Sequence, residues 1–151
     1  MSYKGKYQPK NASKYAGDPT KIIYRSLWER RFMVFCDNNE SIKAWGSEEI
    51  VVPYISPIDG KYHRYFVDFI VELINKNGKK EVVLIEVKPK AQCKAPEKKS
   101  KITRRYLREV KTWGVNSAKW TAAREFAENR GWEFKIMTED ELYKKGSKKK
   151  K

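Results

Sequence analysis

Residues 65–71 read Tyr65-Phe66-Val67-Asp68-Phe69-Ile70-Val71, residues 76–78 read Lys76-Asn77-Gly78, and residues 82–88 read Val82-Val83-Leu84-Ile85-Glu86-Val87-Lys88. The two longer runs are rich in β-branched and aromatic residues, which favour strands. Asn-Gly between two such runs is a strong signal for a β-hairpin. The sequence therefore predicts two antiparallel strands that are adjacent in one sheet.

The turn between these runs sets which residues face each other. If it is a three-residue loop with Gly78 in the left-handed conformation, Asn75 pairs with Lys79 and paired residue numbers add up to 154. In that register Asp68 lies opposite Glu86.

A two-residue loop is the alternative, and it would pair Asp68 with Val87. In the three-residue register two carboxylates face each other, which is destabilising unless a positive charge lies between them. A divalent cation that prefers oxygen ligands is the natural candidate. Lys88 lies two residues from Glu86 and therefore projects from the same face of its strand. Acids on strands are more often solvated than catalytic, but the apolar run 82–85 ends directly at Glu86, which favours a functional site at the end of a buried strand.

Asp68 together with Glu86-Val87-Lys88 resembles the signature of the PD-(D/E)XK nucleases. Val67 stands where the name of that motif has proline, a position that is permissive in this family. The upstream segment Arg25-Ser26-Leu27-Trp28-Glu29-Arg30-Arg31-Phe32 resembles the first helix of the TnsA-like endonuclease branch.

Residues 65–69 and 122–134 continue this resemblance, which covers about residues 24–142. It implies an α/β fold with a mixed central β-sheet flanked by helices, the restriction-endonuclease-like core. It also implies a deoxyribonuclease that depends on Mg²⁺ or Mn²⁺, with endonuclease activity and room for exonuclease activity.

The resemblance also implies a role for each residue of the site. Asp68 and Glu86 would bind the metal ion, with the backbone carbonyl of Val87 as a further ligand. Glu29 would reach the ion directly or through water. Lys88 would orient the attacking water or stabilise the developing negative charge.

Glu29 also has a structural interpretation. Ser26-Leu27-Trp28-Glu29 matches a capping box, in which the glutamate bonds back to the backbone of Ser26. Catalysis and helix capping therefore both remain open for this residue.

The charge of the chain points to an anionic polymer as partner. The 151 residues carry a formal charge of +15, and +9 remains without the six lysines of the tail from Lys144. A basic surface of this strength is typical of proteins that bind nucleic acid.

The most basic segment is expected to contact DNA. Between Lys88 and Lys111 there are ten Lys or Arg against two acids. Helical spacing gathers an apolar face that we expect to pack inward, formed by Ile102, Tyr106, Val110 and Trp113. The residues expected to touch phosphates are Lys101, Arg104, Arg105, Arg108, Lys111 and Lys119.

Three parts are expected along the chain: a flexible basic arm at 1–20, a nuclease domain at 21–143 and a Lys-rich tail at 144–151. The other elements predicted for the domain are a helix over 26–37, a strand over 48–54, a helix from Asn116 or Ser117 to Arg130 that stops at Gly131, a strand over 132–136 and a capping box at 138–141.

The size and the segment Tyr3-Lys4-Gly5-Lys6-Tyr7 resemble bacteriophage head-completion nucleases. That resemblance implies DNA and phage portal or neck proteins as partners, with the host cytoplasm during assembly and the virion as locations. No apolar segment indicates a signal peptide or a membrane span. A non-catalytic DNA-binding module and a structural connector of the virion are the alternatives. Cys36 is expected to be buried, and the single His63 to lie at the surface.

Overall fold

A four-stranded mixed β-sheet forms the centre of the molecule. The structure is a computed structural model, and it describes residues 4–142. In spatial order the strands are β3 (Ile42–Ser47), β6 (Phe69–Ile74), β7 (Lys80–Val87) and β8 (Glu133–Met137). The pair β7–β8 is parallel and the other pairs are antiparallel.

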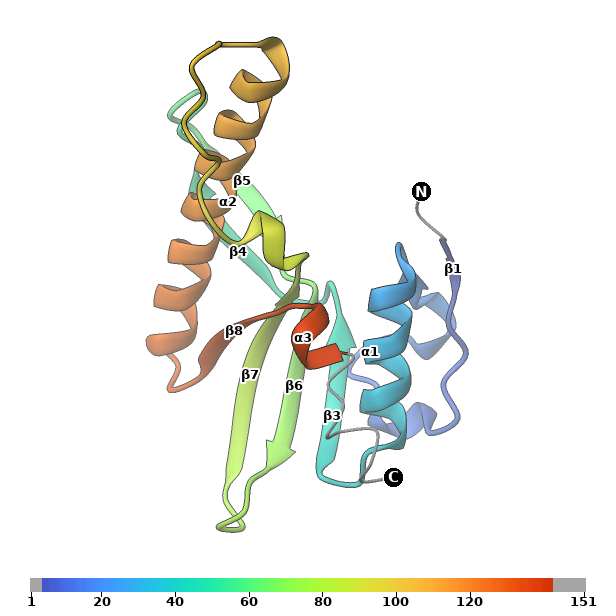
Figure 1. The fold of residues 1–151 in the computed structure, drawn as a ribbon. Coiled ribbons are helices and arrows are strands. Elements are labelled where there is room, and N and C mark those ends of the chain that lie inside the picture. Colours follow the sequence, from blue (N-terminus) through green and yellow to red (C-terminus); the bar gives the residue numbers. More distant parts are fainter. Residues whose placement is uncertain (1–3, 143–151) are drawn as a thin grey trace.

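Two helices cover the two faces of this sheet, α1 (Leu27–Asn38) on one side and α2 (Arg104–Glu128) on the other (Figure 1). The predicted α/β class with a mixed sheet between helices is confirmed. The remaining elements are β1 (Gly5–Lys6), η1 (Ala12–Lys14), η2 (Pro19–Lys21), β2 (Ile23–Tyr24), β4 (Val51–Ile55), β5 (Tyr62–Phe66), η3 (Lys90–Gln92) and α3 (Glu139–Leu142).

The β6–β7 hairpin has the register of the three-residue loop. Gly78 has φ +77°, and the amide of Asn75 donates to the carbonyl of Lys79 at 2.8 Å. Phe69 pairs with Ile85, so the register sum of 154 is confirmed.

Residues 65–71 do not form one strand, contrary to the prediction. The chain leaves one sheet and enters another at Val67-Asp68, because β5 pairs with β4 in a separate two-stranded ribbon. Val67 is buried at this junction, and its amide donates to the carbonyl of Ile50. The junction therefore places Asp68 between the ribbon and the central sheet.

The predicted strand over 48–54 is also wrong at its start. Glu48 has φ +55°, a left-handed conformation that no strand contains. The turn at Glu48 separates β4 from β3, which was not predicted and which forms an edge of the central sheet.

A single helix occupies the region where two were predicted. Thr103 caps α2, since its Oγ1 accepts from the amide of Tyr106 at 3.1 Å. Asn116 and Ser117, the predicted caps of a second helix, lie inside α2, where Asn116 is buried. The predicted stop at Gly131 is correct, with φ +75° there.

The first half of α2 projects beyond the sheet (Figure 1). Ile102 and Val110 are 60% and 41% exposed, so the expectation that the apolar face packs inward is wrong for this half. Only Trp113 at its end reaches the core, where its ring meets that of Trp120 edge-on at 6.0 Å.

The segment before α1 packs onto the domain, so a flexible arm does not describe residues 4–20. Tyr7 and Tyr15 are each only 7% exposed. Buried Asp37 at the end of α1 accepts hydrogen bonds from the hydroxyl of Tyr7 and from the amides of Lys10 and Asn11, at 2.7, 2.7 and 3.0 Å. The Lys-rich tail at 144–151 lies outside the described residues.

Smaller predictions agree with the structure. The capping box at the start of α3 forms, because Oε1 of Glu141 accepts from the amide of Thr138 at 2.7 Å. Cys36 is fully buried, and His63 lies at the surface beside Asp59. Within residues 4–142 no helix has both the length and the apolar character needed to cross a bilayer.

Candidate active site

Glu86 is a buried carboxylate at the end of the central strand β7. Side chains alternate along β7, so that Val83 and Ile85 pack towards α1 whereas Leu84 packs towards α2. Glu86 shares the face of Leu84 and is only 6% exposed. A charge at this depth costs free energy unless a partner compensates for it.

The partner of Glu86 is Tyr65, a residue that the sequence did not indicate. Its hydroxyl donates to Oε1 of Glu86 at 2.5 Å, and its ring is 4% exposed. Burial and the adjacent carboxylate of Glu86 both raise the pKa of the Tyr65 hydroxyl, which therefore keeps its proton and remains a donor.

Asp68 lies at the junction of β5 and β6, opposite Glu86 when the hairpin register is continued by one residue. Its Oδ2 accepts from the amide of Val87 at 2.9 Å. Burial and the neighbouring charge of Glu86 raise the pKa of the Asp68 carboxyl well above its ordinary value. The two acids therefore resist being ionised together, as the sequence predicted for facing carboxylates.

A strained residue holds Asp68 in place. The amide of Glu48 donates to the carbonyl of Asp68 at 3.0 Å, and Glu48 itself has the left-handed backbone described above. The carboxylate of Glu48 is paired with the guanidinium of Arg25. Non-glycine residues in this conformation cost free energy and occur often at functional sites, so Glu48 belongs to the surroundings of the site although no sequence pattern indicated it.

Two lysines lie near the pair formed by Glu86 and Tyr65. Nζ of Lys88 is 3.7 Å from Oε2 of Glu86, on the side predicted by the strand alternation. Lys119 comes from α2, and its Nζ lies 5.5 Å from the centre of the Tyr65 ring and 5.9 Å from that of Tyr54. Lys119 therefore contacts the residue that holds Glu86, whereas it was predicted only to hold DNA.

Glu29 at the start of α1 acts as a helix-capping residue in this structure. The Ser26 hydroxyl accepts from the amide of Glu29 at 3.1 Å, and Oε1 of Glu29 accepts from the amide of Arg25 at 2.9 Å. The capping box is therefore shifted by one residue, because the glutamate bonds to Arg25 and not to Ser26.

The pKa of Glu29 is also affected by the acids of the site. Burial raises the pKa of its carboxyl, and the charges of Glu48 and Glu86 add to this effect, although the Arg25 hydrogen bond opposes it. Glu29 is thus close enough to the acids to interact with them electrostatically while it caps the helix.

The donor atoms of the site fit a hard divalent cation. Among the described residues, Oδ1 of Asp68 accepts no hydrogen bond, and Oε2 of Glu86 has an ion pair with Lys88 at 3.7 Å but accepts no hydrogen bond, so each carboxylate has one oxygen that can reach a metal ion. Carboxylate oxygens are ligands that Mg²⁺ and Mn²⁺ prefer. Among residues 4–142, no three His, Cys, Asp or Glu side chains come close enough together to hold a metal ion. The arrangement therefore offers two carboxylates to a metal ion, with Glu29 held back by its cap.

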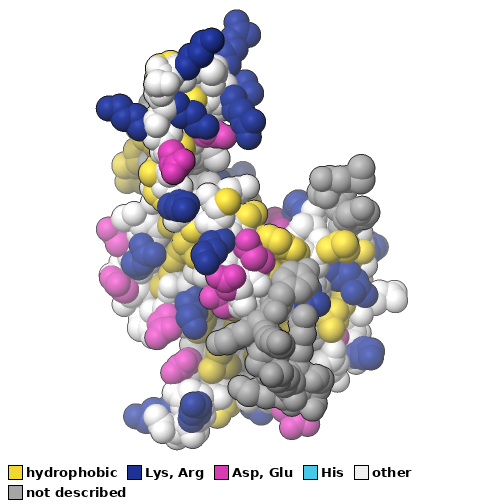
Figure 2. All heavy atoms as spheres, viewed as in Figure 1, with side chains coloured by type: hydrophobic (Ala, Val, Ile, Leu, Met, Phe, Trp, Pro, Cys, Tyr) yellow, Lys and Arg dark blue, Asp and Glu magenta, His cyan; other side chains and the backbone are white. Residues whose placement is uncertain are grey.

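The basic residues expected to contact DNA fall into two groups. Those exposed at the projecting end of α2, where Lys and Arg side chains crowd the surface (Figure 2), are Lys101, Arg104, Arg105, Arg108 and Lys111. Among them Arg105 pairs with Glu109 at 3.3 Å. Lys119 forms the second group, because it lies about two turns beyond Lys111 along the helix, near the Tyr65 ring.

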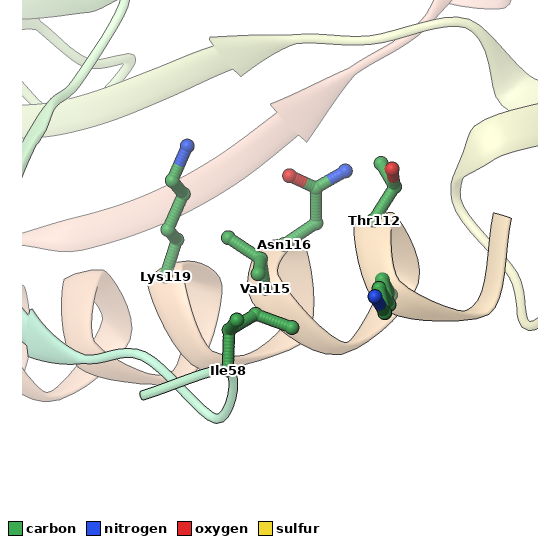
Figure 3. A pocket seen from close by; sticks show the side chains of 6 residues that line it. Ile58, Thr112, Val115, Asn116 and Lys119 are labelled. Carbon is green, nitrogen blue, oxygen red and sulfur yellow. The ribbon is translucent and has the colours of Figure 1, made fainter. Parts of the chain in front are cut away.

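An open hollow of about 320 Å³ connects these two groups. It is lined by Ile58, Lys111, Thr112, Val115, Asn116 and Lys119. Figure 3 shows Thr112, Asn116 and Lys119 projecting in a common direction from successive turns of α2. The hollow therefore runs along α2 from Lys111 to Lys119, whose ammonium group lies near the Tyr65 ring.

Comparison with known proteins identifies the family of the chain. Residues 39–139, which include Asp68, Glu86 and Lys88, match the family described as TnsA-like endonuclease N terminal. The chain is also 45% identical over 152 residues to the head completion nuclease of Enterobacteria phage T4, covering 98% of this chain and 99% of that protein. No solved structure matches the chain. The chain belongs to the family of TnsA-like endonuclease N-terminal domains.

Proposed function

We propose that this protein is a deoxyribonuclease that depends on Mg²⁺ or Mn²⁺ and cleaves DNA phosphodiester bonds as an endonuclease. The observation that carries the proposal is the pair of opposed acids, Asp68 and Glu86, with Lys88 beside them. Two buried carboxylates cost stability when both are ionised, and a bound cation removes that cost. Membership of an endonuclease family supports the same reaction class.

Asp68 and Glu86 are the proposed metal-binding side chains, with the backbone carbonyl of Val87 as a third ligand. When bound, the metal ion neutralises charge on the scissile phosphate and lowers the pKa of a water molecule that attacks it. The protein's own contribution is to hold the two carboxylates rigidly, through the hydroxyl of Tyr65 and the amide of Val87. Ligands that are already oriented need no reorganisation during the reaction.

Lys88 is the proposed electrostatic partner of the reacting phosphate. Its ammonium group lies on the same side as Glu86, where it can orient the attacking water or stabilise the developing negative charge. Glu29 is the proposed fourth member of the site, acting through water, because its carboxylate is engaged by the amide of Arg25.

The basic end of α2 is the proposed binding surface for the DNA backbone. Its exposed Lys and Arg side chains supply positive charge without a matching number of acids, which suits phosphate contacts that do not read sequence. Lys119 is proposed to continue these contacts towards the acids.

The proposed setting is the completion of phage heads and their joining to tails. The support is the similarity over nearly the whole chain to a head completion nuclease. We propose DNA as substrate and phage portal or neck proteins as partners, with action in the host cytoplasm during assembly and presence in the virion. A DNA-binding module or a virion connector without catalysis is the second candidate, favoured by the basic surface alone.

Digestion of supercoiled plasmid separates these functions. The purified chain is incubated with Mg²⁺, with Mn²⁺ or with a chelator, and nicked and linear products are measured. We expect cleavage with either metal and none with the chelator. Asp68→Asn should abolish cleavage, while Glu81→Gln, which alters an exposed acid near the start of β7 and away from Glu86 at its end, should cleave like the parent. Salt-sensitive DNA binding without cleavage would support the binding module, and no DNA binding would support the connector.

A further inference from the structure

The outer face of the β4–β5 ribbon is an exposed apolar surface outside the site described above. The alternation of side chains on paired strands places three cross-strand pairs on this face. These pairs are Val51 with Phe66, Pro53 with Arg64, and Ile55 with Tyr62.

The exposure of this face is unusual for its composition. Tyr62 is 75% exposed, Ile55 51%, Phe66 43% and Val51 37%. The opposite face of the ribbon is buried against α2, so the ribbon has one covered and one uncovered side. Contiguous exposed apolar surface of this kind marks a place where something binds.

The chemistry of the face favours nucleic acid over an apolar protein surface. Arg64 lies over the ring of Phe66, with its guanidinium carbon 5.6 Å from the ring centre. No acid occurs among the six residues of the face. Exposed aromatic rings beside a cation offer bases a stacking surface and offer the phosphates a counter-charge.

The position of the face relative to the acids supports the same occupant. Phe66 lies two residues before Asp68 in the chain. Tyr62 lies four residues before Phe66, about 13 Å further along the strand at about 3.3 Å per residue. A DNA strand with a phosphate at the acids could therefore continue along the outer face of β5.

We infer that the outer face of the β4–β5 ribbon is a stacking platform for the unpaired bases of single-stranded DNA, with Tyr62 and Phe66 as the stacking rings and Arg64 as the phosphate contact. The inference deepens the proposed nuclease function, because it gives the substrate class as DNA with a single-stranded segment. A duplex keeps its base faces stacked on each other, so the platform distinguishes unpaired from paired DNA.

The test is the double variant Tyr62→Leu/Phe66→Leu. Leucine keeps an apolar side chain and removes the aromatic face, so it separates base stacking from general apolar contact. Because both rings are exposed, folding should be retained, and the single variant Tyr62→Leu at the most exposed position provides a second test. Phe35→Leu changes another ring that is 51% exposed, on α1, and serves as the matched control.

Affinity is measured by fluorescence anisotropy with a labelled single-stranded oligonucleotide and with a blunt duplex of equal length, in the presence of chelator. Loss of one stacked base weakens binding by at least about fivefold. We expect the double variant to lose about 25-fold or more for the single strand and to bind the duplex like the parent. Phe35→Leu should change neither affinity.

Three results would overturn the inference. Unchanged single-strand affinity in the double variant would assign the face to an apolar protein partner. An equal loss of affinity for the duplex would show that the face makes a contact other than stacking. If the parent does not bind single strands, single-stranded DNA is not the ligand of this face. Failure of the nuclease proposal can be distinguished from failure of this inference. It would appear as absent plasmid cleavage, whereas the comparison of single-strand and duplex affinities in chelator does not depend on cleavage.

Discussion

The hydroxyl of Tyr65 donates a 2.5 Å hydrogen bond to Oε1 of Glu86, and both side chains are buried. Tyr65→Phe removes the donor and leaves that oxygen without a partner. Because groups that orient a metal ligand typically matter 10- to 100-fold for metal affinity, we expect the Mg²⁺ concentration for half-maximal cleavage to rise at least about tenfold. The matched control is Tyr54→Phe, whose ring also lies near Lys119. An unchanged Mg²⁺ requirement would leave Tyr65 with a packing role only.

Asp68→Asn should stabilise the metal-free protein while it abolishes cleavage. The pKa of Asp68 is raised in the folded state, so ionisation of this carboxyl opposes folding. The stability that the protonated carboxyl contributes is therefore lost as pH rises through that raised pKa. We therefore expect the variant to melt above the parent at neutral pH in chelator, by about 2 to 4 °C for each kcal/mol regained.

Thermal melts across pH provide the check on Asp68. The difference between variant and parent should shrink as pH falls, because Asp68 becomes protonated in the parent. A variant that melts below the parent at neutral pH would mean that the hydrogen bond from Val87 outweighs the repulsion by Glu86.

Glu29→Gln separates catalysis from capping at the start of α1. A glutamine oxygen can still accept from the amide of Arg25, so the melting temperature should change little. If the charge of Glu29 serves the metal site, cleavage should fall at least about tenfold, which corresponds to about 1.4 kcal/mol of barrier. Cleavage at the parental rate would reduce Glu29 to a helix cap.

Neutralising the basic end of α2 should change the salt dependence of DNA binding. If Lys101, Arg104, Arg108 and Lys111 all touch phosphates, their replacement by glutamine should reduce the slope of log affinity against log salt by up to about 3.6. Binding to duplex DNA is titrated at several salt concentrations. The control replaces two exposed lysines of the β6–β7 turn, Lys76 and Lys79. This turn lies at the opposite end of the molecule from the tip of α2 (Figure 1). An unchanged slope would show that this face meets only solvent.

Asp37→Asn should lower the stability of the N-terminal segment. Burial opposes ionisation of Asp37, but hydrogen bonds from Tyr7, Lys10 and Asn11 prevail and lower its pKa. A carboxyl whose pKa is lowered by folding stabilises the protein at pH values above its pKa in the unfolded state. That stability is lost as pH falls through its pKa in the folded state. We expect proteolysis within residues 4–20 to become faster in the variant at neutral pH. Equal cleavage patterns in variant and parent would contradict this role of Asp37.

Local chemistry explains which parts of the fold were predictable. The hairpin register follows from Asn77-Gly78 and from strand alternation, so it was predicted correctly together with the meeting of Asp68, Glu86 and Lys88. The break at Val67-Asp68 follows from a pairing of β5 with β4, which only the folded chain contains. The sequence indicated only that Tyr65 is a strand residue. Its hydrogen bond to Glu86 depends on β5 pairing with β4 outside the central sheet, which the sequence pattern did not predict.

The single helix α2 shows how packing overrides local signals. Asn116 and Ser117 were predicted to begin a second helix, and Gly114 lies inside α2, where a glycine costs about 1 kcal/mol. Burial of Trp120 and the contact of its ring with Trp113 tie both halves to one core. Tertiary contacts of this kind cannot be read from a helical pattern alone.

The continuity of α2 has a consequence for where the chain would cut. Arg104 at its first turn and Lys119 near the Tyr65 ring belong to one unbroken helix, and at 1.5 Å per residue they are about 22 Å apart along its axis. Two helices joined at Asn116 could have swung relative to each other, whereas a single rod keeps this spacing constant. If the tip of α2 binds DNA phosphates as proposed, the scissile bond would fall at a set distance along the DNA from those phosphates, because the helix keeps that distance fixed.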